Sequence, residues 1–193
     1  MAYTLDEFCA DCRKAIREDD GPGAREKVRQ NLERLLENKA FVAENCGPNA
    51  EVGVHTLYHD PETDFYVLAH INAKGRKSPP HDHGTSWAVY GQAVGHTDMT
   101  VWRRLDDGKK PGYAEIEPDH TYRLTPGKAG RFDIRDIHQI EFTDNARFVR
   151  ITGTDLATVP TYRYDPEKKA VHVADRVPAG PVVAHAGAGA GAV

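Results

Sequence analysis

The 193-residue chain is long enough for one domain with a substantial core and short for two domains of ordinary size. Its formal net charge is −4 and charged residues make up 28% of the sequence, so no basic field favours binding to nucleic acid or to an anionic membrane surface. No stretch approaches the roughly 20 apolar residues that cross a bilayer, and residues 1–11 lack the basic-then-apolar plan of a signal peptide. We therefore expect a cytoplasmic protein, a monomer or a homodimer, that binds a small soluble molecule rather than nucleic acid or a membrane.

The first quarter of the chain has the hydrophobic period of α-helices. Apolar residues recur every three or four positions across 4–46. Thr4 followed three residues later by Glu7 has the form of a capping box, and Gly21-Pro22-Gly23 predicts a break in the helical pattern. We predict two helices in this segment.

The three cysteines, Cys9, Cys12 and Cys46, all lie in this helical segment. Their odd number and their clustering argue against a disulfide scaffold and are typical of a reducing compartment. The Cys9-x-x-Cys12 pair has no second pair to complete a zinc site. We interpret these residues as helix thiols.

From residue 51 onward the sequence is typical of antiparallel β-structure. Short runs rich in Val, Ile, Thr, Tyr and Phe are separated by turn dipeptides such as Asp60-Pro61 and Pro126-Gly127. The spacing favours a sandwich or closed barrel, with strands at 51–59, 65–72, 85–91, 97–105, 113–117, 120–124, 130–134, 138–142 and 146–152 and a last hairpin at 162–164 and 171–173. We predict one domain over 1–177, with helices in 4–46 and a barrel in 51–175, followed by a disordered Gly/Ala-rich tail at 178–193.

A pair of histidines, His81 and His83, marks the candidate site. On an extended backbone two residues separated by one other point to the same side, so both imidazoles can bind one ion. A third ligand must come from elsewhere, and His138 at the start of a predicted strand is the natural candidate. Residues some fifty positions apart can meet inside a rolled antiparallel sheet.

The pattern Gly-x5-His81-x-His83 with a distant His138 resembles the two-part motif of the cupin superfamily, and most of all its cysteine dioxygenase branch. The resemblance spans roughly 5–165 and implies a mainly β fold, the cupin double-stranded β-helix or jelly-roll barrel, with two N-terminal α-helices. In most cupins a Glu follows the histidine pair by four or five residues as a fourth ligand, whereas this chain has Trp87 and Ala88 there. That absence is characteristic of thiol dioxygenases, which bind Fe(II) with three histidines.

The resemblance implies an enzyme that inserts both atoms of O2 into a small-molecule thiol or thione to give a sulfinic acid, with Fe(II) and no organic cofactor. Three neutral imidazoles leave a bound metal its full charge and open positions on one side, where a thiolate and dioxygen can bind. The three histidines do not by themselves determine that the metal is iron, because three imidazoles also suit zinc, nickel, copper or manganese.

Three departures from the family pattern restrict the substrate. His55 stands where, counting back from His81 without gaps, relatives place a substrate-binding Arg or Gln. The Ser-x-His-x-Tyr relay expected after the third histidine is missing, and no cysteine lies in the predicted barrel. Cysteine is therefore not the expected substrate. His55, Trp87 and Asp155 together suit an aromatic or cationic thiol such as ergothioneine.

We accordingly predict substrate-binding roles for His55, Trp87, Arg150 and Arg163 and catalytic roles for His55 and Asp155. Arg150 and Arg163 are possible carboxylate anchors, because a guanidinium offers a bidentate fork. Each residue also has a structural interpretation: packing for His55 and Trp87, a turn for Asp155, and a paired or solvated strand position for the two arginines. His70 and the other histidines fit no ligand spacing and are interpreted as structural.

Two other classes of function remain open. The same site suits a dioxygenase that cleaves carbon–carbon bonds or a metal-dependent isomerase, because a fold does not fix its chemistry. It also suits a non-catalytic sensor domain with zinc bound by the three histidines.

Overall fold

The computed structural model describes residues 2–174, so the predicted tail at 178–193 lies outside the described part of the chain. The chain begins with three helices, α1 (Leu5–Glu18), α2 (Pro22–Leu36) and α3 (Lys39–Cys46). The capping box of Thr4 and Glu7 is present at the start of α1. None of the helices within 2–174 is both long enough and apolar enough to cross a membrane.

The prediction of two helices is wrong, because a second break at Asn38 divides the segment into three helices. Its backbone leaves the helical conformation, and its side-chain oxygen accepts hydrogen bonds from the N–H groups of Ala40 and Phe41. An N-cap of this kind starts a new helix without interrupting the spacing of the apolar residues. The hydrophobic period alone therefore did not reveal the break.

The rest of the described chain forms two antiparallel sheets. One has the strand order β1-β2-β10-β5-β8 and the other the order β12-β11-β4-β9-β6-β7, with β3 also paired to β9. The strands of the first sheet are β1 (Gly53–His59), β2 (Tyr66–Ile71), β5 (Ala88–Val94), β8 (Ala129–Phe132) and β10 (Arg147–Thr152). The strands of the second are β3 (Arg76–Lys77), β4 (His81–Asp82), β6 (Thr97–Arg104), β7 (Ile116–Leu124), β9 (Ile137–Phe142), β11 (Tyr162–Asp165) and β12 (Ala170–Val173).

The order of these strands is that of a jelly roll. Between β2 and β10 the chain changes sheet at almost every connection, so that β2-β10-β5-β8 faces β4-β9-β6-β7. This nested arrangement is the double-sheet jelly roll on which cupins are built. The prediction of a mainly β, cupin-type fold is confirmed, and so is the last hairpin, β11–β12.

One strand prediction needs correction. Residues 113–117 and 120–124 do not form two strands, because β7 runs continuously through Pro118. The pairing with β6 shifts by one residue there, which leaves Asp119 without a partner in the register. Proline lacks an N–H group and is tolerated at such a bulge on an edge strand, and β7 is the edge of its sheet.

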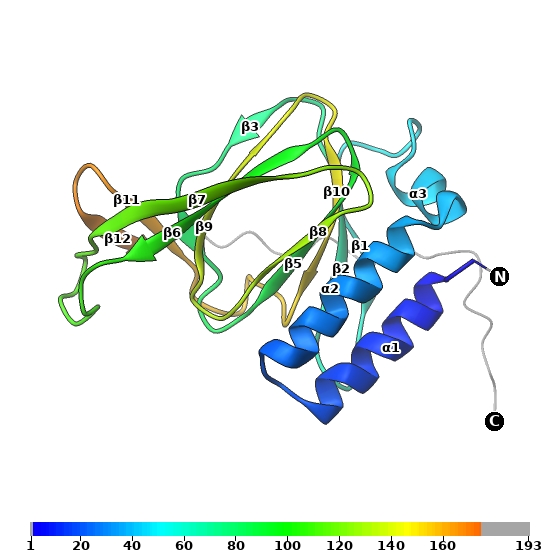
Figure 1. Cartoon of the computed structure of the whole chain (residues 1–193), viewed down its shortest axis with the longest axis horizontal. Coiled ribbons are helices and arrows are strands. Elements are labelled where there is room, and N and C mark those ends of the chain that lie inside the picture. Colours follow the sequence, from blue (N-terminus) through cyan, green and yellow to red (C-terminus); the bar gives the residue numbers. More distant parts are fainter. Residues whose placement is uncertain (1, 175–193) are drawn as a thin grey trace.

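The first sheet is buried on both faces. The helices cover its outer face, where Leu32 and Leu35 of α2 join a buried cluster with Val89, Val149 and Ile151 (Figure 1). Gly91 of β5 permits the close packing, since a Cβ atom there would lie 2.7 Å from Leu32. The alternate residues of the same strands point into the space between the sheets, and this inner face carries the candidate site.

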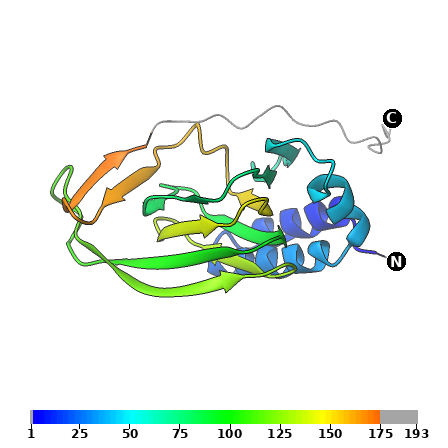
Figure 2. The same cartoon turned by 90° about the horizontal axis from the view of Figure 1, so that it is seen from above.

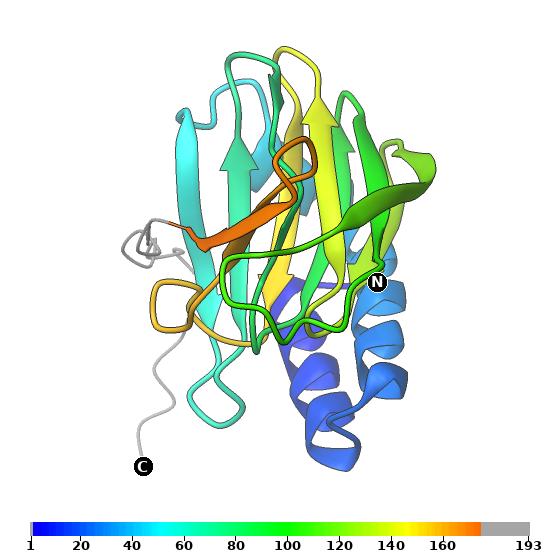
Figure 3. The same ribbon diagram turned by 90° about the vertical axis from the view of Figure 1, so that its left-hand side faces the viewer.

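The helices and the last hairpin lie at opposite ends of the molecule. Figures 1 and 2 both show α1 and α2 at one end and the β11–β12 hairpin at the other. The hairpin, orange in Figure 3, extends the second sheet beyond β4. It therefore adds residues of the C-terminal part of the chain to the edge of the space between the sheets.

Candidate metal centre

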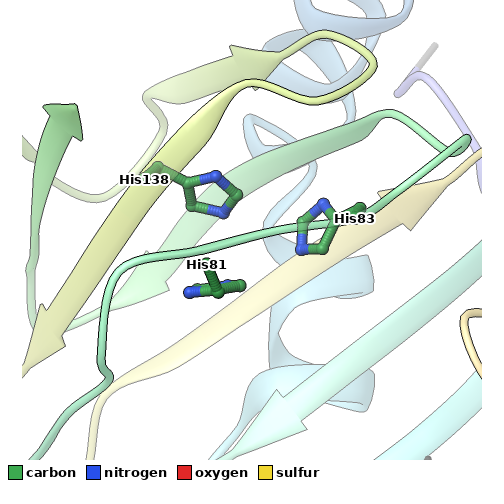
Figure 4. Close-up of side chains that lie close together, drawn as sticks. All are labelled: His81, His83 and His138. Atoms are coloured by element: carbon green, nitrogen blue, oxygen red, sulfur yellow. The ribbon is translucent and has the colours of Figure 1, made fainter. Parts of the chain in front are cut away.

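Three histidine side chains converge between the sheets. His81 of β4 is the direct cross-strand partner of His138 of β9, and His83 follows two residues after His81. Figure 4 shows the three rings facing a common space. One nitrogen of each lies within 4.8 Å of the others, and this is the one group of three or more such donors in residues 2–174. The group can bind a metal ion.

The backbone around the histidine pair is held by Asp82 and Gly84. The carboxylate of Asp82 accepts hydrogen bonds from the Tyr164 hydroxyl at 2.6 Å and from the Gly84 N–H at 2.7 Å. Gly84 has φ +62°, and a Cβ atom there would lie 1.8 Å from the carbonyl oxygen of Pro160. The turn that aims His83 therefore requires glycine.

Hydrogen bonds set the tautomers of two of the imidazoles. His81 Nδ1 lies 3.0 Å from the Pro79 carbonyl oxygen, and His138 Nδ1 lies 3.1 Å from the Asp136 carbonyl oxygen. A carbonyl oxygen only accepts, so both Nδ1 atoms carry the proton and both Nε2 atoms keep a free lone pair. The Phe132 ring stacks on His138 at a centroid distance of 3.8 Å and fixes the plane of that ring.

The donors fit a metal ion. His138 Nε2 is fully buried and has no hydrogen-bond partner among the described residues. An unpaired buried acceptor is costly, and a metal ion would satisfy it. His83 Nε2 has the Tyr90 hydroxyl 3.2 Å away. All three residues would thus present nitrogen to one ion, with imidazole ligands that suit first-row transition metals.

Burial keeps the three histidines neutral. It lowers the pKa of His83 and of His138 well below the usual value, and it lowers the pKa of His81 to about 4 despite the hydrogen bond to Pro79. The neutral imidazole is the form that binds a metal. At neutral pH no proton therefore has to leave before binding.

A cavity of about 370 Å³ opens beside the imidazoles. Its walls combine apolar side chains, among them Leu68, Phe142 and Phe148, with a few charged and aromatic groups. A volume of this size and a mixed lining are typical of small-molecule sites. A ligand in the cavity would lie against the histidines.

Three of the predicted substrate and catalytic residues line this cavity: Arg150, Arg163 and Asp155. Arg150 lies on the inner face of β10 between Leu68 and Tyr90, and its Nε is buried without a partner. Arg163 of β11 is the cross-strand partner of His81. Asp155 follows β10, where its carboxylate also accepts a hydrogen bond from the Ala157 N–H at 3.0 Å, as the turn interpretation expected.

The other two residues do not reach the cavity. His55 is paired with Ala69, whose side is covered by the helices, and its Nε2 lies 2.7 Å from the Glu51 carbonyl oxygen. The neighbouring Val54 lines the cavity instead. Trp87 is 8% exposed and belongs to the buried cluster beneath the helices. Neither position supports a substrate-binding role, because adjacent strand residues point to opposite faces.

Two cavity residues were not predicted as functional. Nothing in the sequence singles out Tyr90, yet it lines the cavity and its hydroxyl lies 3.2 Å from His83 Nε2. His70 was interpreted as structural, yet it lines the cavity, stacks on Phe148 at 4.6 Å, and has a buried Nε2 without a partner among residues 2–174. The alternation of side chains along a strand could have identified His70, because its neighbours Ala69 and Ile71 face the helices and His70 therefore points to the opposite side.

No family model matches the sequence, and no curated protein matches it. Among solved structures, the chain is similar to the Schizosaccharomyces pombe Cnp3 cupin domain, with 13% identity and a TM-score of 0.41 over 56% of this chain and 66% of that chain. It is similar to KdgF from Halomonas sp., with 15% identity and a TM-score of 0.39 over 51% and 74% of the two chains. It also matches an oxalate oxidase, with 15% identity and a TM-score of 0.34 over 46% of this chain and 40% of that chain.

The match thus spans just under two thirds of the yeast domain's chain and less than half of the oxalate oxidase. Similarities at these identities and TM-scores say nothing of the metal or the reaction. The chemistry of the site therefore has to be argued from its own residues.

Proposed function

We propose that His81, His83 and His138 hold one Fe(II) and that the protein is a non-haem iron thiol dioxygenase, which inserts both atoms of O2 into a small-molecule thiol to give a sulfinic acid. The observation that carries the proposal is a donor group of three neutral imidazoles without a carboxylate. Trp87 and Ala88 occupy the positions of the usual fourth ligand. The carboxylate of the adjacent Asp82 is engaged by Tyr164 and Gly84.

A bound Fe(II) would supply a redox-active Lewis acid at which a thiolate and dioxygen can meet. The residues of the chain would bind and orient the substrate beside it. The partly buried guanidinium group of Arg150 is available to a substrate anion, because Arg150 forms no salt bridge among the described residues. The apolar walls at Leu68, Phe142 and Phe148 would limit the access of water.

Tyr90 would act as a hydrogen-bond donor in the same space. Burial raises the pKa of its hydroxyl, although the neighbouring Arg150 acts in the opposite direction. The phenol therefore keeps its proton at neutral pH. Its position 3.2 Å from His83 Nε2 places this proton next to the atoms that would react.

The substrate is not expected to be cysteine, because the Ser-x-His-x-Tyr relay is missing and no cysteine lies in the predicted barrel. The argument from His55 no longer applies, because His55 does not line the cavity. Ergothioneine was suggested by His55, Trp87 and Asp155, and only Asp155 of these lies at the cavity. The cavity thus gives little support to a cationic aromatic thiol, and the proposal does not depend on it.

The test is oxygen uptake by protein loaded with Fe(II) under anaerobic conditions. The panel contains cysteine, 3-mercaptopropionate, mercaptosuccinate, cysteamine and ergothioneine, and a product heavier by two oxygen atoms identifies the sulfinate. His138→Ala should abolish uptake, whereas His120→Ala, on the exposed side of β7, should not. Iron-loaded protein that consumes no oxygen with any thiol would refute the proposal, and full zinc occupancy in protein from its native source would then favour a sensor.

A further inference from the structure

Three arginines line the cavity, and none has an acidic partner among residues 2–174. Arg76, Arg150 and Arg163 are absent from every salt bridge in that part of the chain, whereas most of the other arginines there pair with a carboxylate. Arg150 and Arg163 are partly buried, and a guanidinium group that is removed from water without an acidic partner costs desolvation energy. An anionic ligand in the cavity would compensate this cost, and the exposed Arg76 would add to its binding at the rim.

The three cations come from both walls of the cavity. Arg150 projects from β10 of the first sheet, and its Nε atom is fully buried. Arg163 shares the inner face of the second sheet with His81, its cross-strand partner. Arg76, exposed at the rim, is paired in register with the cavity residue Phe142. Each wall of the cavity thus offers at least one guanidinium group to an anion.

The acidic residues of the cavity do not cancel this charge. Asp82 and Asp155 are its only acidic lining residues in the described chain, and both are engaged in hydrogen bonds of the fold. With neutral histidines and a divalent metal, three arginines and two aspartates leave the cavity with a formal charge of +3. A thiolate that carries two carboxylates has the same charge with the opposite sign.

We propose that the substrate is a thiol dicarboxylic acid, with one carboxylate bound by Arg150 and the other by Arg163 and Arg76 on the opposite wall. This inference rests on the proposed dioxygenase function of the site. Guanidinium groups bind carboxylates through two parallel hydrogen bonds, which fix the substrate's orientation as well as its charge. A thiol with a single carboxylate would leave one wall without its anion, and a quaternary ammonium group would meet repulsion from both.

A matched pair of thiols tests the inference. Mercaptosuccinate differs from 3-mercaptopropionate by one carboxylate, and we expect a kcat/KM higher by about 10- to 100-fold for the diacid. Arg163→Gln should raise KM for the diacid towards that of the monoacid while leaving the monoacid nearly unchanged, and Arg163→Lys should keep part of the preference. Arg123→Gln, which breaks an exposed salt bridge with Asp98 on the outer side of the sheet, is the matched control. Equal kcat/KM for the two thiols, or no effect of Arg163→Gln, would overturn the inference.

A binding measurement separates this inference from the proposed function. Metal-free protein is titrated calorimetrically with succinate and with propionate, neither of which contains sulfur. Tighter binding of succinate, reduced by Arg150→Gln and by Arg163→Gln, supports the dianion site even if no thiol is oxidised. Succinate that binds no better than propionate overturns it, even if the enzyme oxidises monocarboxylic thiols.

Discussion

Removal of the Asp82 carboxylate tests how the chain holds its histidine pair. Asp82 is 2% exposed and accepts two short hydrogen bonds, one from Tyr164 in the neighbouring strand and one from the turn at Gly84. A hydrogen bond to a charged group is worth about 1.5–3 kcal/mol, so Asp82→Ala should lower the free energy of unfolding by about 3–5 kcal/mol. Tyr164→Phe removes one of the two and should cost about half as much.

The same change should loosen the candidate metal site. His81 and His83 flank Asp82, and supporting groups of this kind typically change metal affinity by about 10- to 100-fold. Urea unfolding of the metal-free protein gives the first quantity, and titration with Co(II), followed by its absorption spectrum, gives the second. Asp98→Ala, at an exposed salt bridge, should change neither by a comparable amount. If Asp82→Ala lowers stability but leaves the Co(II) affinity unchanged, Asp82 does not position the histidines and the reasoning fails.

Three further predictions concern acid stability, metal binding and the turn after His83. Burial alone would raise the pKa of Asp60, but hydrogen bonds from Arg13, Thr63 and Tyr58 outweigh it and lower the pKa from 3.8 to about 2. The ionised Asp60 therefore contributes about 2.5 kcal/mol to the free energy of unfolding above pH 4, and this contribution is lost as the pH falls from about 4 to about 2. Asp60→Asn should show the same loss already at pH 7, measured by urea unfolding. Zn(II) at 100 times its Kd should raise the melting temperature by about 5–10 °C, and an unchanged melting temperature, or an equal rise in His138→Ala, would speak against the metal site. Gly84→Ala should cost at least about 2 kcal/mol in unfolding free energy, because the new Cβ meets the Pro160 carbonyl, whereas Gly112→Ala at a similar φ of +71° has nothing within 4 Å and should cost less.

The group of three histidines could be predicted from the sequence because its signals are local. His81 and His83 lie two residues apart on extended backbone, and that spacing alone puts them on one side. His138 opens a predicted strand and needed only to meet this pair across an antiparallel pairing. The short strand β4, which was not predicted, forms that pairing with β9. The short strands and turn dipeptides predicted a sandwich or closed barrel, and the resemblance to cupins implied the jelly roll, which the strand order confirms.

Which side chains of each strand point into the cavity could not be predicted with equal success. His55 was placed by counting back from His81 without gaps, but the register of β1 against β2 contains a shift between Thr56 and Tyr58 and brings Val54 rather than His55 to the cavity. Trp87 precedes a run, Ala88 to Gln92, that is buried throughout. The helices cover the outer face of the first sheet and the second sheet covers its inner face. Both faces are therefore buried, and the polarity of the residues along a strand does not show which face each residue is on.

The first sheet contributes its own side chains to the cavity, and this would separate the proposed anion contact of Arg150 from the proposed metal binding by the three histidines. The three imidazoles come from β4, the residue after it and β9, which are paired within the second sheet. Tyr90, His70 and Arg150 come from β5, β2 and β10 of the first sheet, which has its own hydrogen-bond ladder. A substitution at Arg150 can therefore change which anion binds without moving the histidines, whereas a substitution at Asp82 loosens the histidines and leaves the Arg150 wall in place. Arg150→Gln and Asp82→Ala should thus have opposite profiles, the first in carboxylate binding and the second in metal affinity.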